Sequence, residues 1–289
     1  MHYACIPEQT LLCCILNTVN VKLVLFLTVS RGINLLEKNI KYFKYIKKIF
    51  ILFFRKSRTM HMVLSERKRI IAVGDVHGCL FSLKKLVRLI HLKPDDQLVF
   101  LGDVIDRGDH SKEVVDYLIK LDSSHSCHFL MGNHELMFLD YLENHNSTEW
   151  LANGGEATLK SYSSPAIHDI PQDHIAFLRS FQFTLETENY FFTHGGLDPE
   201  LSIKNNLLYC QPQDFCFQRI HMRPEFLNTS AYNWEKTLVC AHTPVTAPVS
   251  IDRLIAIDTG CVYKDNPLLG TLTAIILPER RIIQTRNID

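Results

Sequence analysis

The sequence has 289 residues, of which 46% are hydrophobic and 21% are charged, a balance that suits a globular protein with one large domain or two small ones. The formal net charge is zero, but ten of the 31 basic residues and only two of the 31 acidic residues lie before position 62. The remaining 21 basic and 29 acidic residues give the rest of the chain a net charge of −8, which argues against duplex nucleic acid as the main partner because phosphate contacts need a basic face.

The first 61 residues differ from the rest of the chain in pattern. Residues 11–29, LLCCILNTVNVKLVLFLTV, approach the roughly 20 apolar residues of a membrane span, but two asparagines and Lys22 interrupt them. Residues 45–58, YIKKIFILFFRKSR, form a shorter apolar patch flanked by basic residues. Two interpretations remain open: the extension, residues 1–61, is not part of the working protein, or residues 11–58 associate with a membrane.

From residue 62 onward, apolar strands alternate with amphipathic helices. The predicted order of strand and helix is 69–74, 80–92, 97–101, 111–121, 127–131 and 135–144. This β-α-β-α-β succession is typical of a mostly parallel sheet with right-handed crossovers. Further strands are predicted at residues 189–194, 237–242, 253–260, 272–277 and 281–285. Because the late strands are closely spaced, we expect a second, partly antiparallel sheet.

Polar residues follow the end of each of six predicted strands. The segments are GDVHG at 74–78, GDVIDRG at 102–108, GNHE at 132–135, HGG at 194–196, AHTP at 241–244 and DTG at 258–260. Ligands of parallel α/β sheets bind beyond the carboxyl ends of the strands. We therefore expect these carboxylates, imidazoles and a carboxamide to meet at one rim.

The first of these segments has the spacing of a cation site. Asp75 and His77 are two residues apart, so in an extended chain they project to the same side and can bind one ion. A mixed set of Asp, His and Asn ligands suits manganese, iron or zinc better than an all-oxygen calcium site. With several such segments at one rim, two ions roughly 3.5–4 Å apart that activate a water between them are expected.

The ordered series GDVHG, GDVIDRG, GNHE, HGG and HTP resembles the phosphoprotein phosphatase branch of the calcineurin-like metallophosphoesterases. Residues 150–162 and 257–263 resemble segments of its bacterial members. Each motif alone is weakly specific, but five in this order are strongly so. The resemblance covers residues 66–289 and implies an α/β fold, a β-sandwich of two mixed sheets flanked by helices. It also implies that residues 62–289 form the catalytic domain.

The resemblance implies two divalent metal ions at this rim, for which we expect manganese, with iron or zinc as alternatives. Asp103 would bridge the two ions, and Asn133 would also contact the substrate. The implied ligands are Asp75, His77 and Asp103 for the first ion, and Asn133, His194 and His242 for the second.

The remaining implied roles concern the phosphoryl group and the leaving group. His134 would be the acid that protonates the leaving oxygen, and Asp106 would orient it, since a carboxylate beside an imidazolium raises its pKa and fixes its tautomer. Arg107 would hold the phosphoryl oxygens through its planar guanidinium. Arg219, with Arg223 as the alternate, would be a second phosphate ligand, although an ordinary ion pair explains Arg219 equally well.

Structural explanations exist for each residue taken singly, such as turns, helix caps and surface histidines, and only the ordered series favours chemistry. Glu135 is expected to support the helix that follows it. We expect His125, His128 and His221 at the surface, and Asn153 and Gly154 in the wall of the substrate cleft. The chain departs from the family in having Ala241 where glycine is usual and a longer segment at 263–270.

The sequence therefore predicts a metal-dependent protein serine/threonine phosphatase with a phosphoprotein substrate and no nucleic-acid partner. The alternative is a symmetrical dinucleoside polyphosphate hydrolase, such as one acting on diadenosine tetraphosphate. Those enzymes typically have Ala and Asp at the positions of Asp106 and Glu135. A third, less favoured hypothesis is a non-catalytic, membrane-tethered binding module. The nine cysteines include no CxxC pair, which predicts reduced thiols and a cytoplasmic location, or membrane association if residues 11–58 form an anchor.

Overall fold

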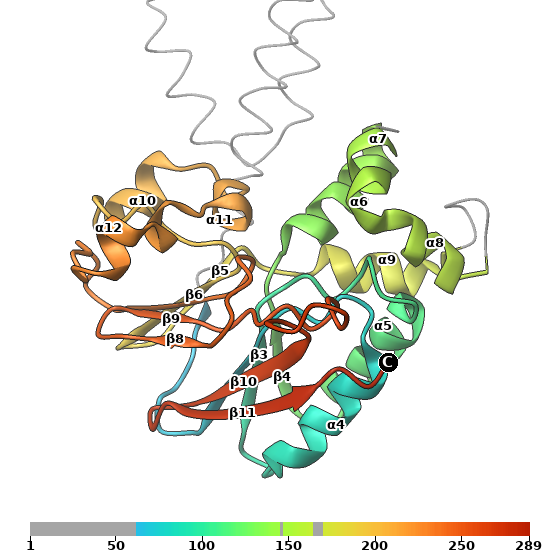
Figure 1. The fold of residues 1–289 in the computed structure, drawn as a ribbon, viewed down its shortest axis with the longest axis horizontal. Coiled ribbons are helices and arrows are strands. Elements are labelled where there is room, and N and C mark those ends of the chain that lie inside the picture. The colour runs from blue at the N-terminus through green and yellow to red at the C-terminus, as the bar shows by residue number, and fades with distance from the viewer. Residues whose placement is uncertain (1–61, 145–146, 164–169) are drawn as a thin grey trace, which may run out of the picture. The chain divides into compact units, whose positions relative to one another are not determined.

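The computed structural model describes residues 62–144, 147–163 and 170–289. The predicted extension, residues 1–61, and the candidate membrane segment within it lie outside the described residues. Among the described residues, no helix has the length and apolar character needed to cross a membrane. The fold is an α/β arrangement of two mixed sheets flanked by helices, as the sequence predicts (Figure 1).

One sheet has five strands in the order β11-β10-β2-β3-β4. Strands β2, β3 and β4 run parallel, whereas β10 is antiparallel to β2 and to β11. The strands are β2 (Ile70–Val73), β3 (Gln97–Phe100), β4 (Ser126–Phe129), β10 (Thr271–Leu277) and β11 (Arg281–Arg286). The expectation that the last two strands belong to the second sheet is therefore wrong. A short turn predicts that two strands pair with each other, but it does not determine which sheet the pair joins.

The other sheet has six strands in the order β1-β5-β6-β7-β9-β8. Strands β6, β7 and β9 are parallel, and β5 and β8 pair antiparallel with β6 and β9. The strands are β1 (Met62–Val63), β5 (Thr184–Glu186), β6 (Tyr190–Thr193), β7 (Thr237–Cys240), β8 (Val249–Ser250) and β9 (Leu254–Ala256). The sequence does not predict β1, β5 or β8, because strands of two or three residues are too short to show a periodicity.

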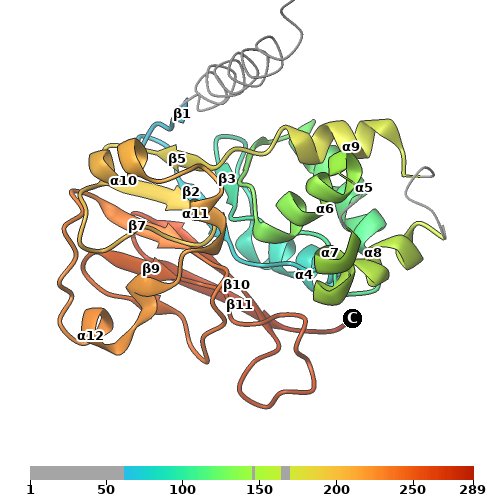
Figure 2. The ribbon, with the colours of Figure 1, turned by 90° about the horizontal axis from the view of Figure 1, so that it is seen from above.

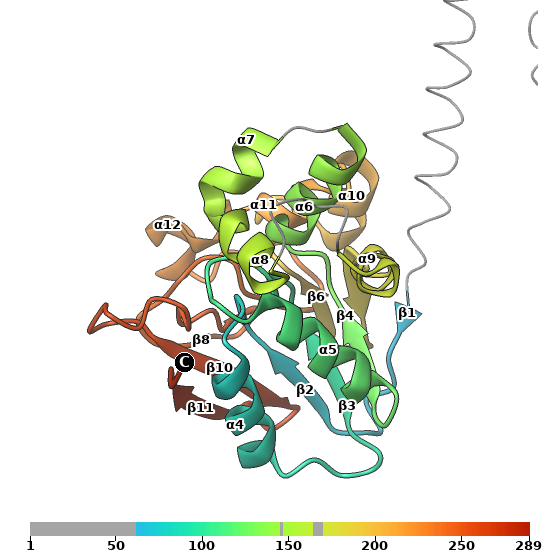
Figure 3. The ribbon, with the colours of Figure 1, turned by 90° about the vertical axis from the view of Figure 1, so that its right-hand side faces the viewer.

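Helices cover the outer face of each sheet. Figures 1 and 2 show α4 to α9 on one side of the molecule and α10 to α12 on the other. Helix α4 packs against β10 and β11, and Figure 3 shows the C-terminus beside it. The helices are α4 (Leu80–Ile90), α5 (Ser111–Asp122), α6 (Asn133–Asn144), α7 (Ser147–Trp150), α8 (Glu156–Ser161), α9 (Gln172–Arg179), α10 (Ile203–Tyr209), α11 (Asp214–Phe217) and α12 (Pro224–Leu227). A π-helical turn, Leu151–Gly155, joins α7 to α8.

The strands are apolar on both faces because each sheet is covered on both sides. In β2, Ile71 and Val73 pack into the core beneath the helices, whereas Ile70 and Ala72 pack into the core between the two sheets. The alternation follows from the period of two residues in a strand. The continuous apolar runs in the sequence therefore mark strands that are buried on both faces.

A buried ion pair fixes the edge where β2 and β3 begin. Asp96 is 1% exposed and accepts hydrogen bonds from Arg69 Nε (2.8 Å) and from the backbone N–H of Lys93 (2.7 Å). A second guanidinium nitrogen of Arg69 also donates to this carboxylate. Burial raises the pKa of Asp96, but the Arg69 and Lys93 hydrogen bonds outweigh it and lower the pKa below its ordinary value of 3.8.

We expect Asp96→Asn to lower the free energy of unfolding by about 2 kcal/mol at pH 7, because hydrogen bonds to a charged group are lost. Since the pKa of Asp96 is lower in the folded state, its contribution is complete above pH 3.8 and is lost as the pH falls below that value. Urea unfolding at pH 7 and pH 3 measures this, with the exposed Asp95→Asn as the control. A difference that does not change with pH would contradict the assignment.

Candidate metal centre

The six parallel strands end at a common rim, where the predicted ligands meet. Strands β2, β3 and β4 run parallel in one sheet, and β6, β7 and β9 run parallel in the other. The segments after β2, β3, β4, β6 and β7 carry all six predicted metal ligands, Asn133 as the first residue of helix α6, and each of these side chains is buried. They are Asp75, His77, Asp103, Asn133, His194 and His242. The structure therefore brings together the residues that the sequence predicts, while their roles as ligands remain a prediction.

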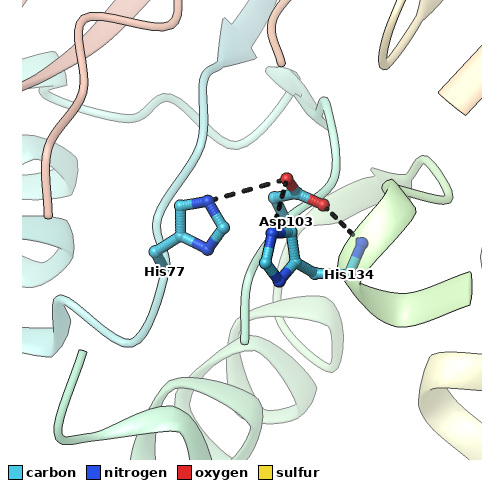
Figure 4. A group of neighbouring side chains, drawn as sticks. All are labelled: His77, Asp103 and His134. Atoms are coloured by element: carbon cyan, nitrogen blue, oxygen red, sulfur yellow. Dashed lines mark hydrogen bonds and ion pairs between the residues drawn. The ribbon is translucent and has the colours of Figure 1, made fainter. Parts of the chain in front are cut away.

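Asp103 lies at the centre of this rim. Its Oδ2 is 3.6 Å from Nε2 of His77 and 3.2 Å from Nε2 of His194. The same oxygen is 4.0 Å from Nε2 of His134, and Figure 4 shows Asp103 between His77 and His134. Two groups of donor atoms are close enough to hold an ion, His77, Asp103 and His134 in the first and Asp103, His194 and His242 in the second, so Asp103 belongs to both. This shared position is what a bridging carboxylate requires.

The backbone fixes the tautomer of two histidines at the centre. Nδ1 of His77 lies 2.9 Å from the carbonyl oxygen of Ile105, and Nδ1 of His194 lies 2.8 Å from that of Leu101. A carbonyl can only accept, so each Nδ1 atom carries a proton, and each Nε2 atom faces the centre. Metal-binding histidines are commonly oriented in this way.

The second group completes the arrangement around His194. Nε2 of His194 is 3.1 Å from Nδ1 of His242 and 3.2 Å from Oδ1 of Asn133. The carboxylate of Asp75 reaches the same place, since its Oδ1 accepts a hydrogen bond of 3.3 Å from the backbone N–H of His242. The two groups therefore share Asp103, and Asp75 lies beside the second of them.

The electrostatics of the centre fit divalent cations. Burial, with the charges of Asp258 and Asp103, raises the pKa of Asp75 well above its usual value. Burial alone would raise the pKa of Asp103 as well, but the imidazoles around it hold that pKa well below its usual value. Among the described residues, the buried Nε2 atom of His242 has no hydrogen-bond partner. Closely spaced buried carboxylates and unsatisfied imidazole nitrogens are stabilised when a cation binds between them. Asp258 is a buried carboxylate that the sequence analysis did not assign.

The backbone at this rim is held in an unusual conformation. Nine described residues other than glycine have a positive φ, and five of them belong to the rim. They are His77, Asp103, Asp106, Arg107 and His242. Such angles cost energy in L-residues and cluster at functional sites.

Glu135 anchors the loop that carries Asp103. Its carboxylate accepts backbone hydrogen bonds from Asp103 (2.8 Å), Val104 (2.8 Å) and Gly132 (3.1 Å). At Gly132 a Cβ atom would lie 2.1 Å from Oδ1 of Asp103, so only glycine allows this close approach. Glu135 thus positions the predicted bridging residue from the first turn of helix α6, which begins at Asn133.

His134 and Asp106 form a directly hydrogen-bonded pair, with 2.7 Å between Nδ1 of His134 and Oδ2 of Asp106. Burial lowers the pKa of His134, but Asp103 and Asp106 outweigh it and raise the pKa above its usual value. A neighbouring carboxylate that favours the protonated form suits a histidine that acts as an acid. This arrangement fits the predicted acid and its orienting carboxylate.

The predicted phosphate-binding arginines both lie at the rim. Nη1 of Arg107 donates to Nε2 of His77 at 2.8 Å, and its Cζ is 5.7 Å from the ring centroid of Tyr263. Arg219 donates from Nη1 to the carbonyl oxygen of His242 and to Oγ1 of Thr243, each at 3.2 Å. The alternate, Arg223, lies instead 3.9 Å from Glu225 at the surface. Tyr263 is a further residue of the rim that the sequence did not reveal, because nothing local marks its approach to Arg107.

Two expectations from the sequence need comment. His221 was expected at the surface but is fully buried, with its ring against Gly196, where a Cβ atom would lie 2.1 Å from Cε1. His125 and His128 are partly exposed. Ala241, where the family usually has glycine, packs into the core between the two sheets, so its methyl group is accommodated there.

The residues around the rim thus define an α/β protein with a candidate two-metal centre, an acid and cationic groups for a phosphoryl ligand. Comparison with known proteins agrees with this class. Residues 68–269, more than half of the chain, match the family described as calcineurin-like phosphoesterase. The chain belongs to this family. The family and fold together establish a metal-binding phosphoester hydrolase and imply a dinuclear divalent metal centre.

The relatives with curated names are hydrolases. The chain is 27% identical to an asymmetrical bis(5'-nucleosyl)-tetraphosphatase of Geobacillus sp. over 73% of this chain and 91% of that one. It is 23% identical to a symmetrical bis(5'-nucleosyl)-tetraphosphatase of Nitrosospira multiformis over 75% and 95% of the two chains. A solved protein serine/threonine phosphatase from Saccharomyces cerevisiae shares the fold, with a TM-score of 0.57, 16% identity and coverage of 98% and 97%.

Proposed function

We propose that this protein hydrolyses dinucleoside polyphosphates such as diadenosine tetraphosphate. The observation that carries the proposal is the similarity to bis(5'-nucleosyl)-tetraphosphatases along nearly their whole length. Arg107 and Tyr263 support it, because a guanidinium next to an aromatic ring that is 37% exposed offers a phosphate ligand and a surface for a base. We therefore rank a dinucleoside polyphosphate substrate above the phosphoprotein substrate that the motifs alone suggest.

Different residues of the chain have different roles in this reaction. When bound, the metal ions supply an activated water and withdraw charge from the phosphoryl oxygens. Asp75, His77 and Asp103 would hold one ion, and Asn133, His194 and His242 the other. Arg107, with Arg219 on the opposite loop, would orient the phosphoryl group and neutralise charge that develops on it. His134 would give its proton from Nε2 to the leaving oxygen while Asp106 holds Nδ1. We propose manganese as the native metal, with iron or zinc as alternatives.

Protein serine/threonine phosphatase activity is the second candidate, and the Asp106–His134 pair favours it. A phosphoserine or phosphothreonine ester leaves as a poor alkoxide that needs a proton, whereas a nucleotide leaves from an anhydride with little help. An intact acid pair, with its 2.7 Å hydrogen bond, is of more use to the first reaction.

The six described cysteines are free, which supports the proposal of a cytoplasmic location.

The test uses the full chain loaded with Mn²⁺. We expect kcat/KM for diadenosine tetraphosphate to exceed that for a phosphothreonine peptide by about tenfold or more, a difference of about 1.4 kcal/mol in the barrier. Chromatography then separates ATP plus AMP from two ADP, and so distinguishes asymmetrical from symmetrical cleavage. Asp103→Asn serves as the negative control for contaminating phosphatases. The reverse preference would make the protein a phosphoprotein phosphatase.

A further inference from the structure

Both oxygens of the Asp106 carboxylate are held by side chains from outside the metal-binding loops. Oδ2 accepts hydrogen bonds from Nδ1 of His134 (2.7 Å) and from Nε1 of Trp150 (2.9 Å), and Oδ1 accepts one from Oγ1 of Thr158 (2.6 Å). The backbone N–H of Asp106 donates to Oγ of Ser111 and to Oγ1 of Thr158, each at 3.0 Å. The carboxylate is 0% exposed, so these protein donors take the place of water.

The donors themselves are rigid. Trp150 is fully buried, and its ring centroid lies 5.1 Å from that of Tyr141 in a stacked arrangement and 5.2 Å from that of Phe138. A buried indole needs an acceptor for its N–H, and Asp106 provides it. Thr158 lies on helix α8 and is 1% exposed. Helices α7 and α8 therefore deliver two fixed donors to one carboxylate.

These hydrogen bonds hold the Asp106 carboxylate in one orientation. The carboxylate in turn fixes the orientation of the His134 ring. Because Asp106 accepts a hydrogen bond from Nδ1–H, the other ring nitrogen, Nε2, faces the metal centre, 4.0 Å from Oδ2 of Asp103. That nitrogen is buried and has no hydrogen-bond partner among the described residues. It is the atom from which a proton would pass to a leaving group.

We propose that Trp150 and Thr158 are positioning residues for the leaving-group acid, acting on His134 through Asp106. The proposal rests on phosphoester hydrolysis at this centre, and its effect is largest on esters whose leaving group needs a proton. It assigns a function to Trp150 and Thr158, whose burial alone would mark them as core residues.

The test is a series of phosphomonoesters of rising leaving-group pKa, from p-nitrophenyl phosphate to alkyl phosphates, with the Mn²⁺-loaded full chain. Trp150→Phe keeps the ring packing but removes the N–H, and Thr158→Val keeps the shape but removes the hydroxyl. Each is expected to lower kcat about 10–100-fold on the alkyl esters and less than about threefold on p-nitrophenyl phosphate, with KM unchanged. Thr158→Ser, which keeps the hydroxyl, is expected to stay close to the parent chain on every ester.

Two further measurements separate positioning from structural damage. NMR of the His134 ring should show its Nδ1 proton in Thr158→Ser at the position of the parent chain, and shifted or lost in Thr158→Val. Mn²⁺ stoichiometry should stay unchanged in all three variants. An equal loss of kcat on all esters, or Thr158→Ser as impaired as Thr158→Val, would overturn the proposal while leaving the proposed function intact. A parent chain inactive on every phosphoester would instead overturn both.

Discussion

Asp103→Asn is expected to remove at least one of the two metal ions and to lower kcat by about a thousandfold or more. The reason is geometric, since one oxygen of Asp103 lies between Nε2 of His77 at 3.6 Å and Nε2 of His194 at 3.2 Å. Replacing that oxygen with a neutral amide removes the charge that both groups of ligands share. Loss of metal assistance is worth several kcal/mol of transition-state stabilisation, and about 4 kcal/mol corresponds to a thousandfold.

Calorimetric titration with Mn²⁺ and elemental analysis of the gel-filtered protein measure the number of ions bound. Asp109→Asn is the matched control, because Asp109 is an exposed carboxylate in the same loop. It should bind two ions and retain the parent activity. Full occupancy in Asp103→Asn would rule out a bridging role for this residue.

His134→Asn is expected to lower kcat about 10²–10⁴-fold on alkyl phosphates while both ions stay bound. Its Nδ1 donates a hydrogen bond of 2.7 Å to Asp106, and its Nε2 has no hydrogen-bond partner in the described part of the chain. This is the arrangement of a proton donor that needs no metal contact. p-Nitrophenyl phosphate, whose leaving group needs no proton, should be hydrolysed at a rate much closer to that of the parent chain. Steady-state kinetics on both esters, with metal titration beside them, measure the effect.

His125→Asn is the control, since His125 is partly exposed and hydrogen-bonded to Oγ of the neighbouring Ser124. It should change neither kinetics nor metal content. If His134→Asn loses metal in proportion to activity, then His134 is a ligand. A metal ion would then lie between Nε2 of His134 and Oδ2 of Asp103, which are 4.0 Å apart. The donor atoms of His77, Asp103 and His134 are close enough together to hold such an ion.

The parts of the site that the sequence predicts are those that lie next to a strand in the chain. Asp75 and His77 follow β2, and Asp103 follows β3, so a correct strand assignment also places the ligands at the ends of the strands. Parallel pairing of these strands then brings their ends together. The alternation of strands and helices was enough to establish this, because the helices of the first half are long enough to show their period and the strands between them are short apolar runs.

Other features depend on residues that are distant in the sequence. Thr158 contacts Asp106 across 52 positions, and the sequence indicated neither that bond nor the one from Trp150. The contact of Tyr263 with Arg107 and the burial of His221 are of the same kind. Each arises from packing between elements that are far apart in the sequence, and the order of the elements along the chain does not predict that they touch.

The sequence by itself thus determined the fold class, the family and the chemical groups of the rim, because turn motifs and strand periodicity are set by covalent neighbours. The tertiary structure decided how those groups are held. It showed that the last two strands complete the first sheet and that Glu135 fixes the Asp103 loop. It also showed that Trp150 and Thr158 donate hydrogen bonds to the Asp106 carboxylate. The physical reason is that orientation at a buried site depends on which donors and acceptors the folded chain brings within hydrogen-bond distance, and no local pattern encodes that choice.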